Sequence, residues 1–263
     1  MKRQKPKVVL TIAGFDPSSG AGISADLKTF SAMGCFGLAA ITSLTAQSTR
    51  GVKQVEPVNG GLLSLTLDEL WADFAVRAIK VGMLGSVEVA QAVAKFLKRV
   101  RCKVVIVDPV LVSSSGMQLL PAQSLKVLVR QIFPLATVIT PNWDEAQRLT
   151  GISAKTKKQM ELVALNLRAM GPKSVIITGG HSPANEDMVL GPSGDVIWIK
   201  GQKLRSRATH GTGCVYSSAL TCYLLGNNDL IEAARLAKLY VRNAIKNAPA
   251  LGHGQGPLGS GTS

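Results

Sequence analysis

Short apolar segments alternate with longer segments of helical character along almost the whole chain, and this alternation restricts the fold more than any other feature. Expected strands cover residues 8–13, 37–44, 78–81, 104–107, 136–140 and 174–178. Expected helices cover residues 23–33, 62–74, 86–98, 122–131, 157–170, 215–225 and 230–247. Strands and helices that alternate in this way form a mainly parallel sheet with helices on both faces. The sequence therefore predicts an α/β fold.

The chain is expected to form one domain, residues 1–263, because no linker or change of composition divides it. Two further apolar segments, 188–190 and 196–199, are separated by a glycine- and proline-containing turn and are predicted to form a hairpin. The basic residues at the N-terminus and the glycine-rich residues 252–263 are expected to be flexible.

Composition excludes several classes of function. Hydrophobic residues make up 46% of the chain, yet no uninterrupted apolar segment is long enough to span a bilayer. The four cysteines show neither a CxxC pair nor the spacing of metal ligands, so a zinc site is not expected. The net charge of +14 arises from dispersed basic clusters without interleaved aromatic residues, which does not favour nucleic-acid binding. We expect a soluble, cytoplasmic protein that binds neither nucleic acid nor membranes.

A glycine-rich turn, Ala208-Thr209-His210-Gly211-Thr212-Gly213-Cys214, precedes the predicted helix 215–225. The first N–H groups of a helix have no partner within it and attract anions such as phosphate. Cys214 would lie at the positive end of the helix dipole, which should lower the pKa of its thiol. The same residues also fit an ordinary loop before a buried helix, so the motif leaves both interpretations open.

Polar or glycine-containing segments follow most predicted strands. Because parallel strands end at the same edge of a sheet, these segments should meet in one cleft beside the Gly211–Cys214 turn. Asp108 and Glu145, which follow two of these strands, are carboxylates that suit Mg²⁺. They could equally be a turn residue and a helix-start residue. A metal ion, an anion-binding loop and a base are what phosphoryl transfer needs.

Several short motifs follow one another along nearly the whole chain: Thr11-Ile12-Ala13-Gly14, Gly20-Ala21-Gly22-Ile23, Ala25-Asp26-Leu27-Lys28-Thr29-Phe30, Thr45-Ala46-Gln47, Lys80-Val81-Gly82-Met83-Leu84, Asp108-Pro109-Val110, Thr140-Pro141-Asn142 with Glu145-Ala146, Gly179-Gly180-His181 and Thr209-His210-Gly211-Thr212-Gly213-Cys214. In this order they resemble the hydroxymethylpyrimidine/phosphomethylpyrimidine kinases of thiamin biosynthesis, which belong to the ribokinase-like superfamily.

The resemblance implies a ribokinase-like kinase that uses ATP and Mg²⁺ and that is often a homodimer. The implied reaction is phosphorylation of 4-amino-5-hydroxymethyl-2-methylpyrimidine, with its monophosphate as a possible second substrate. Residues that would line the pyrimidine pocket are Gly14, Ala21, Asp26, Gln47, Met83 and Val110. Cys214 would be the catalytic base, and Gly211, Thr212 and Gly213 would form the anion hole. ATP would contact Asn142, Thr178, Gly180 and Thr209, and Mg²⁺ would be organised by Asp108 and Glu145.

Three positions depart from the family pattern. Ser114 and Thr178 stand where many members carry lysine, and Phe15 replaces a small hydroxyl residue beside the expected pocket. Two alternatives therefore stay open. One is a pyridoxal or pyridoxine kinase, and the other is a pyrimidine-binding protein with little kinase activity.

Overall fold

The computed structural model describes residues 5–113, 115–180, 185–202, 204 and 206–261. Within them nine strands form one sheet in the order β3-β2-β1-β4-β5-β6-β7-β8-β9. Neighbouring strands from β2 to β7 are parallel, whereas β3, β8 and β9 are antiparallel additions, which confirms the predicted fold class. The strands are β1 (Val8–Phe15), β2 (Phe36–Ser48), β3 (Gly51–Pro57), β4 (Val76–Val81), β5 (Val105–Val107), β6 (Val138–Ile139), β7 (Ser174–Ile177), β8 (Asp187–Leu190) and β9 (Val196–Ile199).

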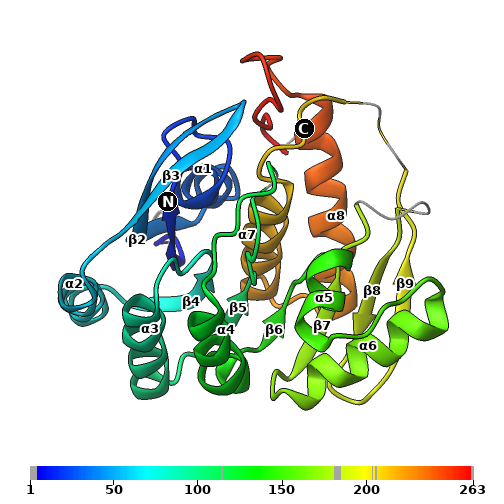
Figure 1. The fold of residues 1–263 in the computed structure, drawn as a ribbon, viewed down its shortest axis with the longest axis horizontal. Coiled ribbons are helices and arrows are strands. Elements are labelled where there is room, and N and C mark those ends of the chain that lie inside the picture. The colour runs from blue at the N-terminus through cyan, green and yellow to red at the C-terminus, as the bar shows by residue number, and fades with distance from the viewer. Residues whose placement is uncertain (1–4, 114, 181–184, 203, 205, 262–263) are drawn as a thin grey trace.

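Helices cover both faces of the sheet (Figure 1). One layer contains α1 (Gly22–Ala32), α7 (Thr212–Leu225) and α8 (Leu230–Lys246), and the other contains α2 (Gly60–Asp73), α3 (Val87–Val100), α4 (Ala122–Val127), α5 (Trp143–Thr150) and α6 (Lys157–Ala169). After α4 the chain continues as a π-helical turn, Leu128–Ile132, and a 3₁₀ turn, Phe133–Leu135. Each predicted helix is therefore present, with bounds that shift by a few residues.

The hydrophobic core is divided into two parts by the sheet because successive side chains of a strand point to opposite faces. In β5, Val105 and Val107 pack against the layer of α2–α6, whereas Ile106 packs against the layer of α7 and α8. The central strands are apolar on both faces for this reason, which is the pattern that made them recognisable in the sequence.

The main difference from the expected elements is at one edge of the sheet. Residues 45–51, which look like a polar turn, continue β2 as far as Ser48 and then turn into the antiparallel strand β3. Strand β3 was not predicted because Lys53, Gln54 and Glu56 interrupt its apolar residues, and none of its residues is buried at this edge of the sheet. The predicted hairpin of β8 and β9 is confirmed.

The C-terminal tail packs against the body of the molecule instead of extending from it as a flexible segment. The amide of Gly259 donates a hydrogen bond to the carbonyl of Ala244 at 2.9 Å, and the amide of Gln255 donates to the carbonyl of Thr49 at 2.8 Å. The tail therefore connects α8 with the turn between β2 and β3. The basic N-terminal residues 1–4 lie outside the described residues.

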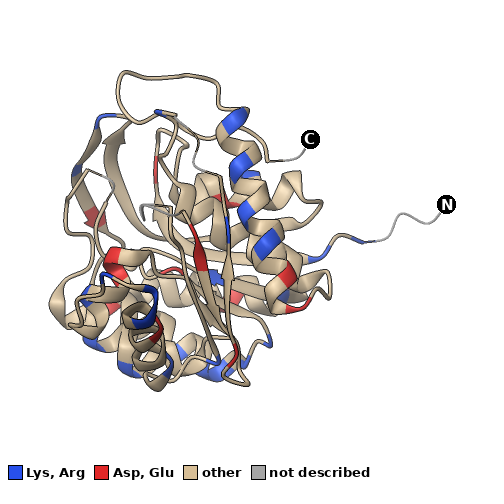
Figure 2. Ribbon diagram, turned by 90° about the vertical axis from the view of Figure 1, so that its right-hand side faces the viewer, with Lys and Arg blue, Asp and Glu red and all other residues tan. Residues whose placement is uncertain are grey.

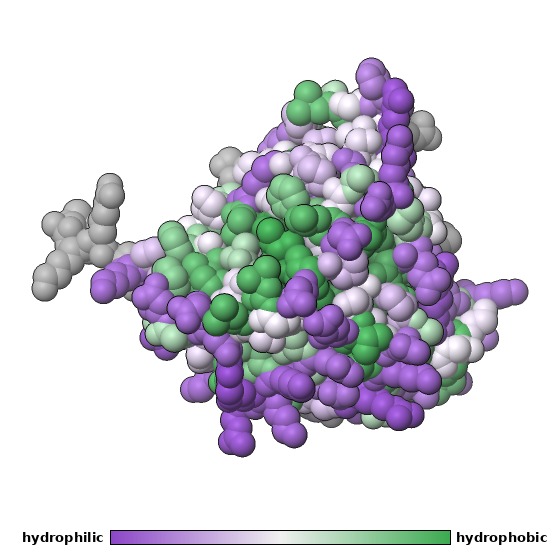
Figure 3. All heavy atoms as spheres, turned by 60° about the vertical axis from the view of Figure 1, so that its left-hand side comes forward, coloured by the Kyte–Doolittle hydropathy of each residue, from purple (hydrophilic) through white to green (hydrophobic). Residues whose placement is uncertain are grey.

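The surface carries both charged and apolar areas. Figure 2 shows basic residues on several elements, α8 among them, rather than in one cluster. Hydrophobic surface gathers on the side formed by β2, β3 and α2 (Figure 3), where Phe36, Leu44, Leu62 and Leu65 are exposed. The homodimer that the resemblance implies stays a prediction.

None of the helices in the described part of the chain combines the length and the apolar character that a bilayer crossing requires.

Candidate active site

The start of α7 has the features of an anion-binding turn. Gly211, its N-cap, is in the left-handed region with φ of +80°, and a Cβ atom there would overlap the carbonyl oxygen of Gly20. No side chain caps the helix, and its first turn contains no acidic residue. The first N–H groups of a helix attract anions such as phosphate, and the role of this turn as an anion site stays a prediction.

Asp108 lies directly beside this turn, after the end of β5. A Cβ atom on Gly213 would be 3.7 Å from the Oδ2 atom of Asp108, and the hydroxyl of Ser217 donates a hydrogen bond to the same oxygen at 3.2 Å. Burial and the negative charge of Asp26 raise the pKa of Asp108 to about 6, although Lys80 opposes this shift. Asp108 is thus a buried carboxylate that faces an uncapped helix N-terminus.

Glu145 fills the helix-start role, one of the two alternatives that the sequence left open, and its role as a metal ligand stays a prediction. It forms a capping box at the start of α5, in which its Oε2 atom accepts from the amide of Asn142 at 2.9 Å and the side chain of Asn142 accepts from the amide of Glu145. Its Oε1 atom accepts from the amide of Leu111 at 3.3 Å. Burial and the charge of Asp108 raise the pKa of Glu145 to about 8, so the two carboxylates repel each other.

A divalent cation fits this pair of carboxylates because it would offset their repulsion. Among the described residues no group of three or more His, Cys, Asp or Glu side chains is placed to hold a metal ion. Mg²⁺ does not need such a group, since it retains waters and usually binds one or two carboxylates together with substrate phosphates. Asp108 and Glu145 therefore suit a metal ion that arrives with a nucleotide.

Cys214 is in the first turn of α7, half-buried, and the amide of Gly22 at the start of α1 hydrogen-bonds its sulfur. Burial raises the pKa of its thiol to about 12, and the charges of Asp108 and Asp26 add to this effect, while Lys80 opposes it. The expectation that the helix dipole lowers this pKa is wrong for the ligand-free protein, because loss of solvation outweighs the dipole.

Asp26, predicted to contact the pyrimidine, lies beneath the turn and is completely buried. Its two oxygens accept from the ammonium of Lys80 at 3.0 and 2.9 Å, from the hydroxyl of Thr11 at 2.6 Å and from the hydroxyl of Ser218 at 2.7 Å. Lys80 is also fully buried, and the charge of Asp26 raises its pKa despite the burial that lowers it. The carboxylate is therefore fully hydrogen-bonded within the protein in this form.

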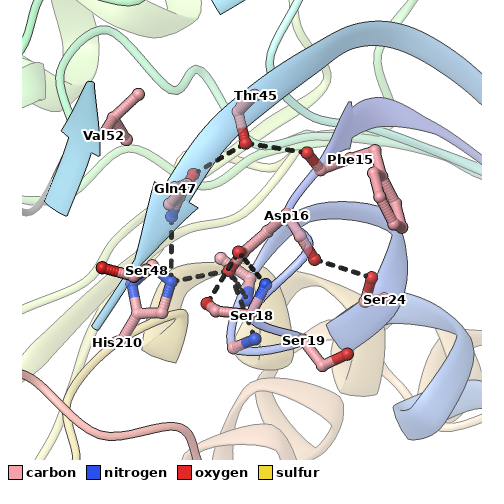
Figure 4. Close-up of polar contacts among 12 residues, drawn as sticks. Phe15, Asp16, Ser18, Ser19, Ser24, Thr45, Gln47, Ser48, Val52 and His210 are labelled. Atoms are coloured by element: carbon pink, nitrogen blue, oxygen red, sulfur yellow. Dashed lines mark hydrogen bonds and ion pairs between the residues drawn. The ribbon is translucent and has the colours of Figure 1, made fainter. Parts of the chain in front are cut away.

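A second polar cluster lies above the turn and joins three separate segments (Figure 4). Asp16 accepts hydrogen bonds from the amides of Gly20 and Ala21 at 3.2 and 2.9 Å, and from the amide and hydroxyl of Ser18 at 2.8 and 2.7 Å. The Nε2 atom of His210 is 2.7 Å from Asp16 and 3.0 Å from the amide nitrogen of Gln47. This cluster places Gln47 beside both the β1–α1 loop and the turn before α7.

The other predicted pocket residues lie close to these two clusters. A Cβ atom on Gly14 would be 3.1 Å from the sulfur of Met83, so the ends of β1 and β4 are in contact. Ala21 is the N-cap of α1, and the amide of Val110 donates to the carbonyl of Asp108 at 2.9 Å. The structure thus gathers Gly14, Ala21, Met83 and Val110 at one edge of the sheet.

The predicted ATP residues are more widely spread. Asn142 and Thr178 are paired by a β-bridge at the ends of β6 and β7. Gly180 is exposed after β7, and a Cβ atom there would have nothing within 4 Å. Thr209 is exposed in the loop before α7. These positions leave room for a ligand along the ends of β6 and β7, and their role in ATP binding stays a prediction.

The positions that depart from the family pattern have different surroundings. The carbonyl of Phe15 accepts from the hydroxyl of Thr45 at 2.9 Å, and Figure 4 shows its ring directed away from the cluster of Asp16 and His210. Thr178 donates its amide to the carbonyl of Pro141 at 2.9 Å. Ser114, like His181 of the Gly-Gly-His motif, lies outside the described residues.

Sequence reasoning did not single out Asp16, His210 or Lys80 as site residues. For two of them the sequence contains a feature that could have indicated their role. Lys80 is the one charged residue in the apolar segment 78–81, so it required a buried partner. Asp16 precedes Pro-Ser-Ser-Gly, a sequence in which an aspartate accepts hydrogen bonds from its own loop. His210 contacts segments distant in the chain, and nothing local in the sequence indicates this.

Comparison with known proteins agrees with this geometry. A family model described as phosphomethylpyrimidine kinase matches residues 16–259. A hydroxymethylpyrimidine/phosphomethylpyrimidine kinase of Haemophilus influenzae is 40% identical over 256 residues, which cover 95% of each chain. A thiamine biosynthesis bifunctional protein of Geobacter sulfurreducens is 39% identical over 257 residues, but these cover 95% of the present chain and 51% of that protein.

Solved structures give the same result. The phosphomethylpyrimidine kinase of Clostridium difficile superposes with a TM-score of 0.81 and 38% identity, covering 91% of this chain and 99% of that one. The pyridoxal kinase of Bacillus subtilis, in an ADP complex, superposes with a TM-score of 0.88 and 32% identity, covering 97% and 98%. The match across the strands, the α7 turn and the tail shows that the chain belongs to the phosphomethylpyrimidine kinase family.

Proposed function

We propose that this protein transfers the γ-phosphate of ATP to the hydroxymethyl group of 4-amino-5-hydroxymethyl-2-methylpyrimidine, a reaction of thiamin biosynthesis. The protein is a phosphotransferase that uses ATP, and the relative from Haemophilus influenzae carries the name of this activity over nearly its whole length. Because the reaction consumes ATP, we also propose that the protein acts in the cytoplasm.

The observation that carries the proposal is the uncapped turn of α7, with Asp108 and Cys214 beside it. The N–H groups of this turn would stabilise the charge on the transferred phosphoryl group, because a fixed donor in a water-poor site needs no reorganisation during the reaction. Gly211 allows the close approach of the turn to the β1–α1 loop, since a side chain there would overlap the carbonyl of Gly20, whereas a Cβ atom on Gly213 would make only an ordinary contact with Asp108.

Asp108 and Glu145 would hold Mg²⁺ through their carboxylates. The ion supplies neutralisation of the phosphate oxygens when it is bound with the nucleotide. The protein keeps both carboxylates in place without the ion, because Ser217 hydrogen-bonds Asp108 and two backbone amides hydrogen-bond Glu145.

The acceptor hydroxyl must lose its proton as the new P–O bond forms. We propose that this proton moves to the sulfur of Cys214 in its thiolate form, which exists only after the thiol has given its own proton to solvent. Burial raises the pKa of the thiol to about 12 in the ligand-free protein, and the charge of Lys80 and the amide of Gly22 favour the thiolate against it. A bound metal ion that neutralises Asp108 would remove one of the charges that disfavour the thiolate. Gln47 would orient the pyrimidine ring, because its amide can both donate to and accept from ring nitrogens and the amino group.

The test is release of ADP with three acceptors in parallel: the pyrimidine alcohol, its monophosphate and pyridoxal. We expect turnover of the pyrimidine alcohol. The variant Cys214→Ala should lose about 10²- to 10⁴-fold in kcat, the contribution of a general base, while it still binds the alcohol in calorimetry. Full activity of this variant would remove Cys214 from the role of base.

A pyridoxal kinase is the second candidate, and one observation favours it. The structure superposes on a pyridoxal kinase with a TM-score of 0.88, slightly higher than the 0.81 found for a phosphomethylpyrimidine kinase. Both acceptors are heteroaromatic rings with a hydroxymethyl group, so the fold accommodates either. A higher kcat/KM for pyridoxal than for the pyrimidine alcohol would favour this alternative.

A further inference from the structure

A cavity of about 460 Å³ lies immediately outside the cluster of Asp16, Gln47 and His210. Its walls are the turn between β2 and β3, residues 206–210, the tail at Gly254 and Gln255, and Ser115. His210 lines the cavity and belongs to the cluster, so the cavity adjoins the proposed site of the acceptor. Its volume is within the range of ordinary ligand pockets.

Among the described residues, those that line the cavity carry two positive charges and no negative one. Arg50 and Arg207 line the cavity, and none of its lining residues is Asp or Glu. Across the described residues neither guanidinium forms an ion pair with a carboxylate. The guanidinium of Arg207 donates one hydrogen bond, to the carbonyl of His253 at 3.3 Å, and so retains further donors. The remaining walls are rich in hydroxyl groups, from Ser48, Thr49, Ser115, Ser206 and Thr209.

Hydrogen bonds join the segments that form the walls of the cavity. The amide of Gln255 donates to the carbonyl of Thr49 at 2.8 Å, and the amide of Gly256 donates to the carbonyl of Arg207 at 3.1 Å. On the other side the amide of Val52 donates to the hydroxyl of Ser115 at 3.3 Å. The two arginines are therefore carried by segments that are tied to each other through the C-terminal tail.

The chemistry of the walls selects an anion with several oxygens. Arginine binds phosphate through two parallel N–H···O bonds, and serine and threonine hydroxyls donate to the remaining oxygens. The turn of α7 itself, Gly211 to Cys214, contains no charged residue, and the charge of buried Lys80 is neutralised by Asp26. Arg50 and Arg207 therefore supply positive charge that the α7 turn lacks.

The position of the cavity favours the acceptor over the nucleotide as the source of this phosphate. The cavity adjoins Gln47, through His210, whereas Asn142, Thr178 and Gly180 do not line it. Only Thr209 of the proposed ATP residues does so, and it lies two residues before the α7 turn. An acceptor whose ring contacts Gln47 could place a phosphate here and still approach that turn.

We propose that Arg50 and Arg207 bind the phosphate group of a phosphorylated acceptor, the pyrimidine monophosphate, and so allow a second phosphoryl transfer. This inference depends on the proposed function. In the second transfer an oxygen of the acceptor phosphate forms a bond to the γ-phosphorus of ATP, and the bond to the β–γ bridging oxygen breaks. ADP leaves with that electron pair, and no proton has to be removed from an acceptor phosphate that is already a dianion.

The test compares Arg50→Ala and Arg207→Ala with Arg235→Ala, an exposed arginine of α8 that is remote in sequence from both clusters and does not line the cavity. Both cavity arginines are exposed, so the variants should fold, and thermal melts check this. We expect each cavity variant to lose about 10- to 100-fold in kcat/KM for the monophosphate, as for a lost charge-assisted hydrogen bond. The kcat/KM for the alcohol and the KM for ATP should stay within about twofold, and Arg235→Ala should match the wild type.

Three results would overturn the inference: no selective change in either variant, an equal loss with both acceptors, or an increase in the KM for ATP, which would assign the cavity to the nucleotide. Calorimetry with the alcohol and the monophosphate, without ATP, separates this inference from the proposed function. If the wild type phosphorylates neither acceptor, the proposed function fails. Binding of the monophosphate that is weakened in the arginine variants still supports the inference, and absence of such binding overturns it.

Discussion

Two aspartates on either side of the β1–α1 loop show two ways of burying a carboxylate. Asp26 is 0% exposed and is paired with the ammonium of Lys80, beneath the turn of α7. Asp16 is 3% exposed and is held by backbone amides of its own loop and by His210, above the same turn. The lower cluster joins β1, α1, β4 and α7, whereas the upper cluster joins loops and the end of β2.

The comparison indicates that the two clusters contribute differently to the site, the lower one to its stability and the upper one to binding. An ion pair without solvent needs its partner at all times, because an uncompensated buried charge costs several kcal/mol. We therefore expect the lower cluster to be rigid and to support Cys214 and the first turn of α7. A carboxylate bound by loop amides can exchange these partners for water, so we expect the upper cluster to adjust to a substrate more readily than the lower one.

The largest effect is expected when the positive charge of the lower cluster, that of Lys80, is removed. Lys80→Met leaves Asp26 buried and unpaired, which should lower the free energy of unfolding by about 3–5 kcal/mol. Urea unfolding measures the change. The double variant Lys80→Met, Asp26→Leu should be more stable than the sum of the two single losses predicts, because it removes the charge as well as its partner. Strict additivity would show that the pair does not act as a unit.

A substitution in the α7 turn, which lies between the two clusters, should lower stability nearly as much as Lys80→Met. Gly211→Ala places a side chain in the left-handed region, which costs about 1–2 kcal/mol, and also against the carbonyl of Gly20. Gly151→Ala is the matched control, since Gly151 has φ of +70° but open space around its Cβ position. We expect a greater loss of stability, and a loss of turnover, for Gly211→Ala. Equal behaviour of the two variants would mean that only backbone strain matters at Gly211.

Removal of the upper carboxylate should affect binding more than folding. Asp16→Ala leaves the amides of Gly20 and Ala21 without their acceptor and should lower stability by about 1–3 kcal/mol. Because the loop also adjoins the proposed acceptor pocket, the KM for the alcohol should rise more than kcat falls. Steady-state kinetics measures both constants, and a loss confined to kcat would argue against a flexible upper cluster.

The smallest effect is expected in the pH dependence of stability. Burial alone would raise the pKa of Asp16, but the hydrogen bonds from His210 and Ser18 outweigh it and hold this pKa below its ordinary value. A carboxyl whose pKa is lower in the folded state stabilises the fold above its unfolded pKa of about 3.9, and this contribution is lost as pH falls through the folded value. The stability difference between wild type and Asp16→Asn should be constant near neutral pH and should shrink below about pH 4. Urea unfolding at several pH values tests this, and a constant difference would contradict it.

The fold was largely predictable, and so was the edge of the sheet at which the candidate site lies. The strands that carry Val9, Ile106 and Ile176 are apolar on both faces, and the turn at Gly211 has the glycine that this left-handed, uncapped helix start requires. The convergence of Gly14, Met83 and Asp108 followed from the common direction of parallel strands.

The protonation of Cys214 and the burial of Asp26 were not predictable in the same way. The dipole of α7 acts along the helix and can be inferred from the order of residues. Desolvation and the charges of Asp108 and Lys80 come from other strands, and they decide the pKa of the thiol. The edge strand β3 was missed for a related reason, since its pairing with β2 and not its own composition makes it a strand.

Local patterns of apolar residues, glycines and helix caps were therefore sufficient to predict most of the elements, their order and the edge of the sheet at which the candidate site lies, because these depend on neighbours in the chain. Which carboxylate is paired with the buried Lys80, and that Arg50 and Arg207 line the same cavity, depended on the packing of segments far apart in the chain. Solvation and charge vary with distance in space, and the order of residues alone does not specify that distance.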